Sequence, residues 1–100
     1  MYLVLCRDFA DERSAKNRLT ALRSHLSYIE TILEKIVVAG PLRDDFTAAI
    51  TGSLLIYNVD SEAAARGLLE ADPYYHADIW ESVEIRRFQP VAGEWVGGKT

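Results

Sequence analysis

The sequence predicts an α+β protein whose elements follow the order β-α-β-β-α-β, and two patterns support this interpretation. Apolar residues recur in steps of three and four between residues 11 and 35, which is the period of an amphipathic helix. Short apolar or alternating runs bounded by turn residues stand on both sides of it, as strands do. This order is typical of a ferredoxin-like fold, a four-stranded antiparallel sheet with two helices on one face. The 100 residues, 49% of them hydrophobic, suit one domain over 1–100.

The first strand and the long helix have the clearest signals. Residues 2–7 are apolar and too continuous for an amphipathic helix, so we expect a strand that is central in its sheet or buried on both faces. The helix should begin at Asp11 or Ser14, because acidic residues favour a helix N-terminus, and end near Lys35. Its predicted buried stripe comprises Ala15, Leu19, Leu22, Leu26, Ile29 and Leu33.

The later elements follow from β-branched runs, caps and turn residues. We expect a strand over 36–42, a loop over 43–52, a strand over 53–59, a helix over 62–71 and a strand over 79–88. Asp60 or Ser61 offers the N-cap of the second helix. A tail over 89–100 contains Gly, Pro and the aromatic Trp95.

The strand over 53–59 has large apolar residues on both faces. Leu54 and Ile56 lie on one face, and Leu55 and Tyr57 lie on the other. Two helices cover only one face of a ferredoxin-like sheet, and a bare apolar face on a single chain promotes association. We therefore expect a homodimer with two-fold symmetry that forms through the sheet faces. The tail can extend this interface, because Trp is enriched at interface cores.

Composition limits the classes of partner. A net charge of −4 lacks the clustered Lys and Arg that nucleic-acid binding needs. The N-terminus has no signal-peptide pattern, and no apolar run approaches the ~18 residues of a membrane span. We therefore expect a cytoplasmic protein that binds neither nucleic acid nor membrane. The single cysteine, Cys6, lies in an apolar run, so it is interpreted as a buried small hydrophobe.

His25 is the first candidate for chemistry. At ~100° per residue it lies about 60° from Leu22 and 40° from Ile29, on the flank of the predicted stripe. Two interpretations are open. The ring is either a core-edge group bonded to backbone or water, or an acid or base in a pocket, since histidine titrates near neutrality.

Asp72 is the second candidate. It precedes Pro73, which disfavours helical backbone in the residue before it. As a turn starter, Asp72 could cap a short turn over 73–76. The nearby aromatics are interpreted as packing or interface residues, and His76 as exposed or a partner of Asp72. The histidines and carboxylates lack metal-site spacing, so we expect no metal and no cofactor.

Five segments, taken in order, carry a family resemblance: 1-MYLVLCRD-8, 19-LTALRSHLSYIE-30, 39-AGPLRDD-45, 52-GSLLIYNVDS-61 and 72-DPYYHADIWESVEIRRF-88. Through them the chain resembles the YciI-like family, also called the YCII-related domain. The resemblance implies a dimeric α+β barrel, similar to that of muconolactone isomerases and small monooxygenases. It also implies an active site built on a histidine and an aspartate, which match His25 and Asp72.

This implied site sets further expectations. The second helix should end beside the first, so that Asp72 reaches His25 and Pro73 holds the aspartate at a fixed angle. We then expect the walls of the pocket to include Tyr28, Tyr74 and Trp80. Either Arg23 or Ser53 would anchor an anionic or hydroxylated small-molecule ligand.

Three functions remain as hypotheses. The first is a cofactor-free lyase, isomerase or hydrolytic enzyme with His25 and Asp72 as its general acid–base pair. The second is a non-catalytic dimeric module that binds a ligand or serves a larger complex, in which the same contact is structural. The third is oxygen or haem chemistry, as in some barrel relatives.

Overall fold

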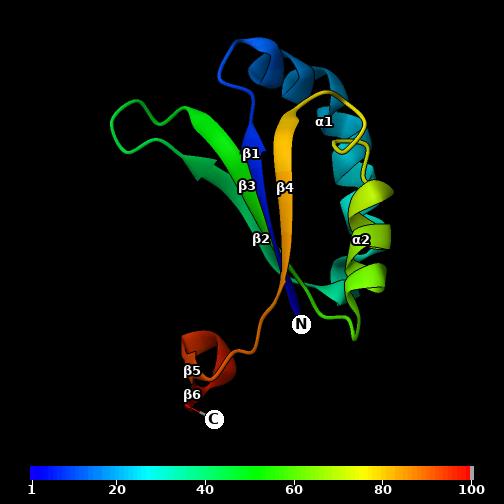
Figure 1. Ribbon diagram of the computed structural model, residues 1–100, viewed down its shortest axis with the longest axis vertical. Helices are drawn as coiled ribbons and strands as arrows, with labels where there is room; N and C mark the ends of the chain where they lie inside the picture. Colours follow the sequence, from blue (N-terminus) through cyan, green and yellow to red (C-terminus); the bar gives the residue numbers. More distant parts are fainter. Residues whose placement is uncertain (100) are drawn as a thin grey trace.

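The predicted α+β ferredoxin-like arrangement is confirmed. A computed structural model describes residues 1–99 and has a four-stranded antiparallel sheet with both helices on one side (Figure 1). The sheet order is β2-β3-β1-β4, so the first strand is central as expected. The elements are β1 (Tyr2–Asp8), α1 (Arg13–Thr31), β2 (Ile36–Arg43), β3 (Ile50–Tyr57), α2 (Glu62–Glu70) and β4 (Trp80–Arg87).

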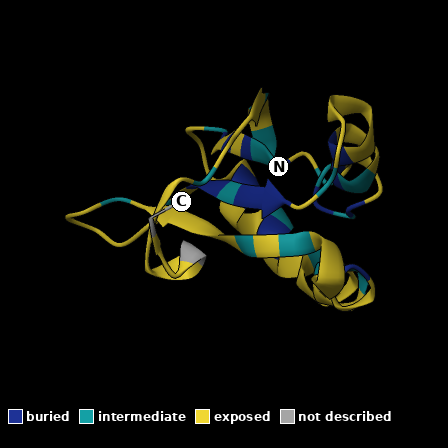
Figure 2. Ribbon diagram, turned by 90° about the horizontal axis from the view of Figure 1, so that it is seen from below, coloured by how far each residue is buried: buried dark blue, intermediate teal, exposed yellow. Residues whose placement is uncertain are grey.

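The hydrophobic core lies between the two central strands and the helices. Val4 pairs with Leu55 across β1 and β3, and both side chains are buried. Ala65 and Leu69 of α2 pack on them from the helix side. Figure 2 shows the buried residues concentrated in the central strands. Cys6 belongs to this core, and burial raises the pKa of its thiol to about 12, in agreement with its expected role as a buried hydrophobe.

The largest differences from the predicted boundaries are at the end of α1 and in the loop between β2 and β3, whereas β3, α2 and β4 end within two residues of the prediction. The helix α1 ends at Thr31 rather than near Lys35, because Ile32 leaves helical geometry (φ −124°) and a 3-10 turn over Leu33–Lys35 follows. The loop expected over 43–52 is shorter, since β2 and β3 pair as far as Arg43 and Ile50. Ser61 is the N-cap of α2 and accepts a hydrogen bond from the Ala64 amide at 3.1 Å.

The predicted buried stripe of α1 is largely exposed in this chain, which corrects the sequence interpretation. Leu19 is 78% exposed, Leu26 is 51% and Leu33 is 61%. The fully buried residues of α1 are instead Ser14 and Arg18. The helix therefore turns a polar face toward the rest of the protein and leaves its apolar face at the edge of the structure.

The tail continues beyond β4 into a small hairpin of β5 (Ala92–Gly93) and β6 (Gly98–Lys99), joined by a 3-10 turn over Glu94–Val96. It extends away from the end of the sheet (Figure 1). Trp95 is 75% exposed there. Thr100, the last residue of the predicted tail, lies outside the described residues. No helix within residues 1–99 is long and apolar enough to cross a membrane.

Gly52 is a position where the sheet has no room for a side chain. A Cβ at Gly52 would overlap the backbone carbonyl of Cys6 on β1. We expect Gly52→Ala to lower the free energy of unfolding by about 1–3 kcal/mol, the usual cost of overpacking. Gly40→Ala is the matched control, because nothing lies within 4 Å of its Cβ position. Urea unfolding of both variants is the measurement, and equal midpoints would contradict the prediction.

Candidate active site

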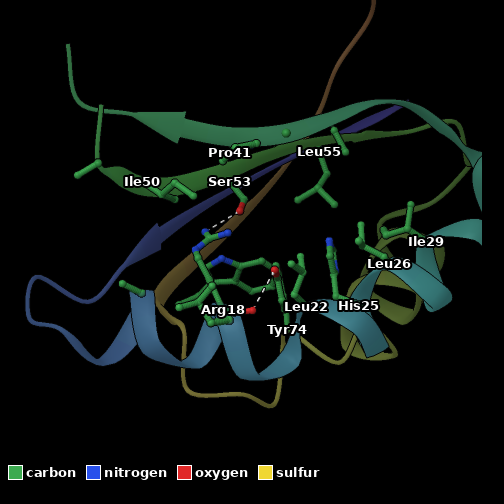
Figure 3. Close-up of a pocket in the computed structure, with 16 residues that line it drawn as sticks. Arg18, Leu22, His25, Leu26, Ile29, Pro41, Ile50, Ser53, Leu55 and Tyr74 are labelled. Atoms are coloured by element: carbon green, nitrogen blue, oxygen red, sulfur yellow. Dashed lines mark hydrogen bonds between the residues drawn. The ribbon is translucent and has the colours of Figure 1, made fainter. Parts of the chain in front are cut away.

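A cavity of about 660 Å³ lies between α1 and the strands β2 and β3. Side chains from both layers point into it, as Figure 3 shows for Leu22 and His25 from the helix and Leu55 from β3. Most of its lining is apolar, and the polar lining residues are Arg18, His25, Ser53, Tyr74 and Trp80. This size and lining are typical of a small-molecule site, where a few polar groups lie within an apolar wall.

The cavity exists because α1 is attached through polar side chains. The attached residues lie within an arc of about 80° of the helix surface at ~100° per residue. They are Ser14, which donates to the Ile79 carbonyl, Arg18, which donates to Asp8, His25, which contacts Asp72, and Tyr28, which donates to the Leu68 carbonyl. The leucine face, formed by Leu19, Leu22 and Leu26, is centred about 100° from this polar stripe. Its side chains line the cavity beside β2 and β3 and remain exposed.

His25 and Asp72 meet at one end of the cavity. Nδ1 of His25 lies 2.8 Å from Oδ1 of Asp72, which is fully buried. A carboxylate accepts hydrogen bonds only, so Nδ1 carries the hydrogen, and in the neutral ring Nε2 is the acceptor nitrogen. The ring stacks on Tyr74, with centroids 3.7 Å apart and planes within 4°. His25 is therefore fixed in both tautomer and ring plane.

Asp72 also performs the turn role that the sequence suggested. Its Oδ1 accepts a hydrogen bond from the Tyr74 amide at 2.9 Å, so one oxygen holds both the turn and the imidazole. The other oxygen, Oδ2, is buried and has no hydrogen-bond partner among the described residues. An unpaired buried carboxylate oxygen is costly and requires an explanation, of which a catalytic role is one.

An ion pair between Arg18 and Asp8 lies two helical turns from His25 along α1. Arg18 donates to both oxygens of Asp8 through Nε and Nη2, each at 2.8 Å. Its Nη2 also donates to Ser53 Oγ at 2.9 Å. Both partners are nearly enclosed, with Arg18 8% and Asp8 6% exposed. The bidentate geometry suits a buried pair, and Nη2 makes further bonds to Ser53 and to the Gly52 carbonyl oxygen.

The residues predicted as walls and anchors fall into three groups. Ser53, Tyr74 and Trp80 line the cavity. Tyr28 lies outside the lining and donates to the Leu68 carbonyl at 2.6 Å. Arg23 is exposed and is not part of the lining, since its position on α1 points away from the sheet. His76 is exposed, and its Nε2 lies 2.8 Å from the Glu70 carbonyl oxygen.

Arg18 is the residue that the sequence interpretation missed. It lies seven residues before His25, a spacing that places both on one face of a helix within about 20°. That spacing can be seen in the sequence, whereas the pairing of Arg18 with Asp8 depends on how α1 packs on β1. The residues described contain no group of three or more His, Cys, Asp or Glu that could hold a metal ion.

The two tyrosines of this region act as neutral hydrogen-bond donors. Burial raises the pKa of Tyr74, whose hydroxyl donates to the Arg18 carbonyl at 3.4 Å. Burial, followed by the negative charge of Asp72, raises the pKa of Tyr28. Trp80 meets the Tyr74 ring edge-on at 6.1 Å. The aromatic wall beside His25 is thus packed and uncharged.

A family model and two known proteins match this chain over most of its length. The model of the YCII-related domain matches residues 1–89. Protein YciI of Escherichia coli O6:H1 is 31% identical over 98 residues, covering 91% of this chain and 98% of the relative. Protein YciI of Shigella flexneri matches to the same extent.

Solved structures agree with these relatives. A 5-chloro-2-hydroxyhydroquinone dehydrochlorinase, TftG, from Burkholderia phenoliruptrix AC1100, in complex with 2,5-dihydroxybenzoquinone, superposes with a TM-score of 0.78. It is 26% identical, and the match covers 93% of this chain and 95% of TftG. A NIPSNAP family protein from Agrobacterium tumefaciens, 17% identical with a TM-score of 0.54 and 90% of each chain covered, shares the fold.

The buried Arg18–Asp8 pair gives a stability prediction. We expect Arg18→Met to lower the free energy of unfolding by about 3–5 kcal/mol, because the Asp8 carboxylate then stays buried without a counter-charge. Combining it with Asp8→Leu should restore much of the loss. The control Arg66→Met removes an exposed pair with Glu62 and should cost less than ~1 kcal/mol. Chemical denaturation is the measurement, and equal losses in Arg18→Met and Arg66→Met would contradict this account.

Proposed function

This chain belongs to the YCII-related domain family, and we propose that it is an enzyme that moves a proton on a small molecule with His25 and Asp72. The contact between Nδ1 of His25 and the buried Asp72, beside a cavity of about 660 Å³, carries the proposal. It leaves Nε2 of the same ring without a hydrogen-bond partner among residues 1–99. A histidine held in this way is suited to general acid–base catalysis.

The proposed step uses only this chain's residues. Nε2 of neutral His25 takes a proton from the substrate, and Asp72 stabilises the imidazolium that forms. The proton is then returned to product or water. Stacking on Tyr74 keeps the ring in one plane, so Nε2 approaches the substrate from a fixed direction.

Among lyase, isomerase and hydrolytic reactions, elimination receives the most support. The structural neighbour TftG is a dehydrochlorinase. In such a step His25 removes a proton from carbon, the C–H electrons form a new double bond, and the leaving group departs with its bonding electrons. The step is redox-neutral and needs no cofactor.

A second candidate is a non-catalytic ligand-binding or accessory module. It is favoured by the hydrogen bond from the Tyr74 amide to Asp72, which gives the aspartate a structural role without catalysis. In that case the His25–Asp72 contact only fixes the turn after α2.

We also propose that the chain forms a two-fold homodimer through the sheet face opposite the helices. Leu5 and Leu54 are cross-strand neighbours on that face. Leu5 is 38% exposed and Leu42 is 37% exposed. An apolar face of this kind is a typical site of association.

Replacing His25 tests the catalytic proposal. We expect His25→Ala to lower kcat by about 10²–10⁴-fold, the usual contribution of a general acid or base. The first compound to assay, by chloride release, is 5-chloro-2-hydroxyhydroquinone, followed by other halogenated or isomerisable rings. The matched control is His76→Ala, whose imidazole is exposed and outside the cavity. A fully active His25→Ala variant would sink the proposal.

The variant Asp72→Asn separates the two candidate functions. For an enzyme, activity falls beyond any loss of stability, and the imidazole nitrogen signals in NMR lose the Nδ1-protonated signature. For a non-catalytic module, the variant only loses free energy of unfolding, by the ~1.5–3 kcal/mol of a charged hydrogen bond. Ligand binding then changes only in proportion to the folded fraction.

The dimer is tested by mutating the open sheet face. We expect Leu5→Glu to convert the dimer into a monomer, because a carboxylate would be buried at the interface without a partner. The control is Leu19→Glu, which places the same charge on the opposite side of the molecule and should leave the dimer intact. Light scattering coupled to gel filtration measures both. A wild-type chain that elutes as a monomer would contradict the proposal.

A further inference from the structure

The end of the cavity opposite His25 has hydrogen-bond donors that nothing else in the described residues uses. Arg18 bonds through Nε and Nη2 only, and within residues 1–99 its Nη1 has no hydrogen-bond partner. Nη1 is not one of the fully enclosed unpaired atoms, so it keeps some accessible surface, and Arg18 lines the cavity. Ser53 Oγ accepts from Nη2, which leaves the hydroxyl hydrogen of Ser53 available.

We propose that Arg18 Nη1 and the Ser53 hydroxyl together bind an acceptor oxygen of the substrate, a carbonyl or a phenolate. Both groups offer hydrogens, so an oxygen that only accepts satisfies both of them, whereas an apolar substituent leaves both unpaired. The inference rests on the proposed function and extends it by naming the substrate class. That class is a small ring molecule with an acceptor oxygen at one end and the reacting proton at the other.

Asp8 makes this oxygen site selective. Its carboxylate neutralises Arg18 at 2.8 Å, so the pair has little net charge to attract anions in general. Recognition then depends on hydrogen-bond geometry, and the guanidinium is held in place by Asp8, Ser53 and the Gly52 carbonyl. An anchor that is already fixed loses little entropy when a ligand binds.

The shape of the cavity supports the ring. Between Arg18 and His25 the cavity is bounded by Leu22 on the helix side, by Leu55 on the strand side and by the Tyr74 ring, which contacts both residues (Figure 3). The backbone positions of Arg18 and His25 lie two helical turns apart, ~10 Å along α1, and the guanidinium and the imidazole lie closer than this because both contact the Tyr74 ring. A ring with polar substituents at opposite ends can contact both while its faces meet leucine side chains.

Two probes of equal shape test the oxygen site. We expect 4-nitrophenolate to bind at least ~10-fold more tightly than 4-nitrotoluene, since only the first carries an acceptor oxygen at that position. NMR titration above the pKa of the phenol gives both affinities. Ser53→Ala and Arg18→Lys should each reduce the preference by about 3–10-fold and leave the affinity for 4-nitrotoluene unchanged.

Two control variants have their substitutions outside the cavity. Thr51→Ala and Arg66→Lys remove or change the same groups outside the cavity and should keep the preference. If Arg18→Lys does not fold, Ser53→Ala decides, because it retains the Arg18–Asp8 pair. Equal binding of both probes, failure of both to bind, or a preference that survives in the variants would overturn the inference. The preference should also persist in His25→Ala, so a failure of the acid–base proposal remains distinguishable.

Discussion

The polar stripe of α1 is the constraint on which the rest of this structure depends. Ser14, Arg18, His25 and Tyr28 attach the helix to β1, to the loop before β4 and to the end of α2. Helices in globular proteins usually bury an apolar stripe instead, because burying a leucine contributes about 1.5–3 kcal/mol whereas a hydrogen bond contributes about 0.5–1.5 kcal/mol. Here the leucine face is left free, and the cavity forms beneath it.

The proposed function gives different tasks to the Arg18–Asp8 pair and to the His25–Asp72 contact. Arginine stays protonated at all relevant pH values, so Arg18 and Asp8 form a permanent anchor at the join of α1 and β1. The His25–Asp72 contact is the one to which we assign the proposed proton transfer, since it leaves Nε2 without a hydrogen-bond partner among residues 1–99. Tyr74 connects them, since its ring stacks on His25 and its hydroxyl donates to the backbone of Arg18. The site is thus one unit in which each group is held by another.

Much of the fold could be predicted from the sequence, because strands, helices and caps depend on local patterns. The order of elements, the central position of β1, the Ser61 cap and the burial of Cys6 all followed from short stretches. The candidate site was less accessible. His25 and Asp72 were found through a family resemblance, because 47 residues separate them. Arg18 was missed, because its role depends on Asp8 and Ser53, which belong to other elements.

By itself, the sequence determined that α1 has an apolar face and a polar face, because that follows from a repeat of 3.6 residues. Only the tertiary structure decided which face turns inward. Two buried carboxylates, Asp8 and Asp72, require hydrogen-bond partners in low-dielectric surroundings, and α1 supplies the Arg18 guanidinium and the Nδ1–H of His25 to them. Satisfying these charges orients the helix, and the leucines that local periodicity assigned to the core become the wall of the cavity.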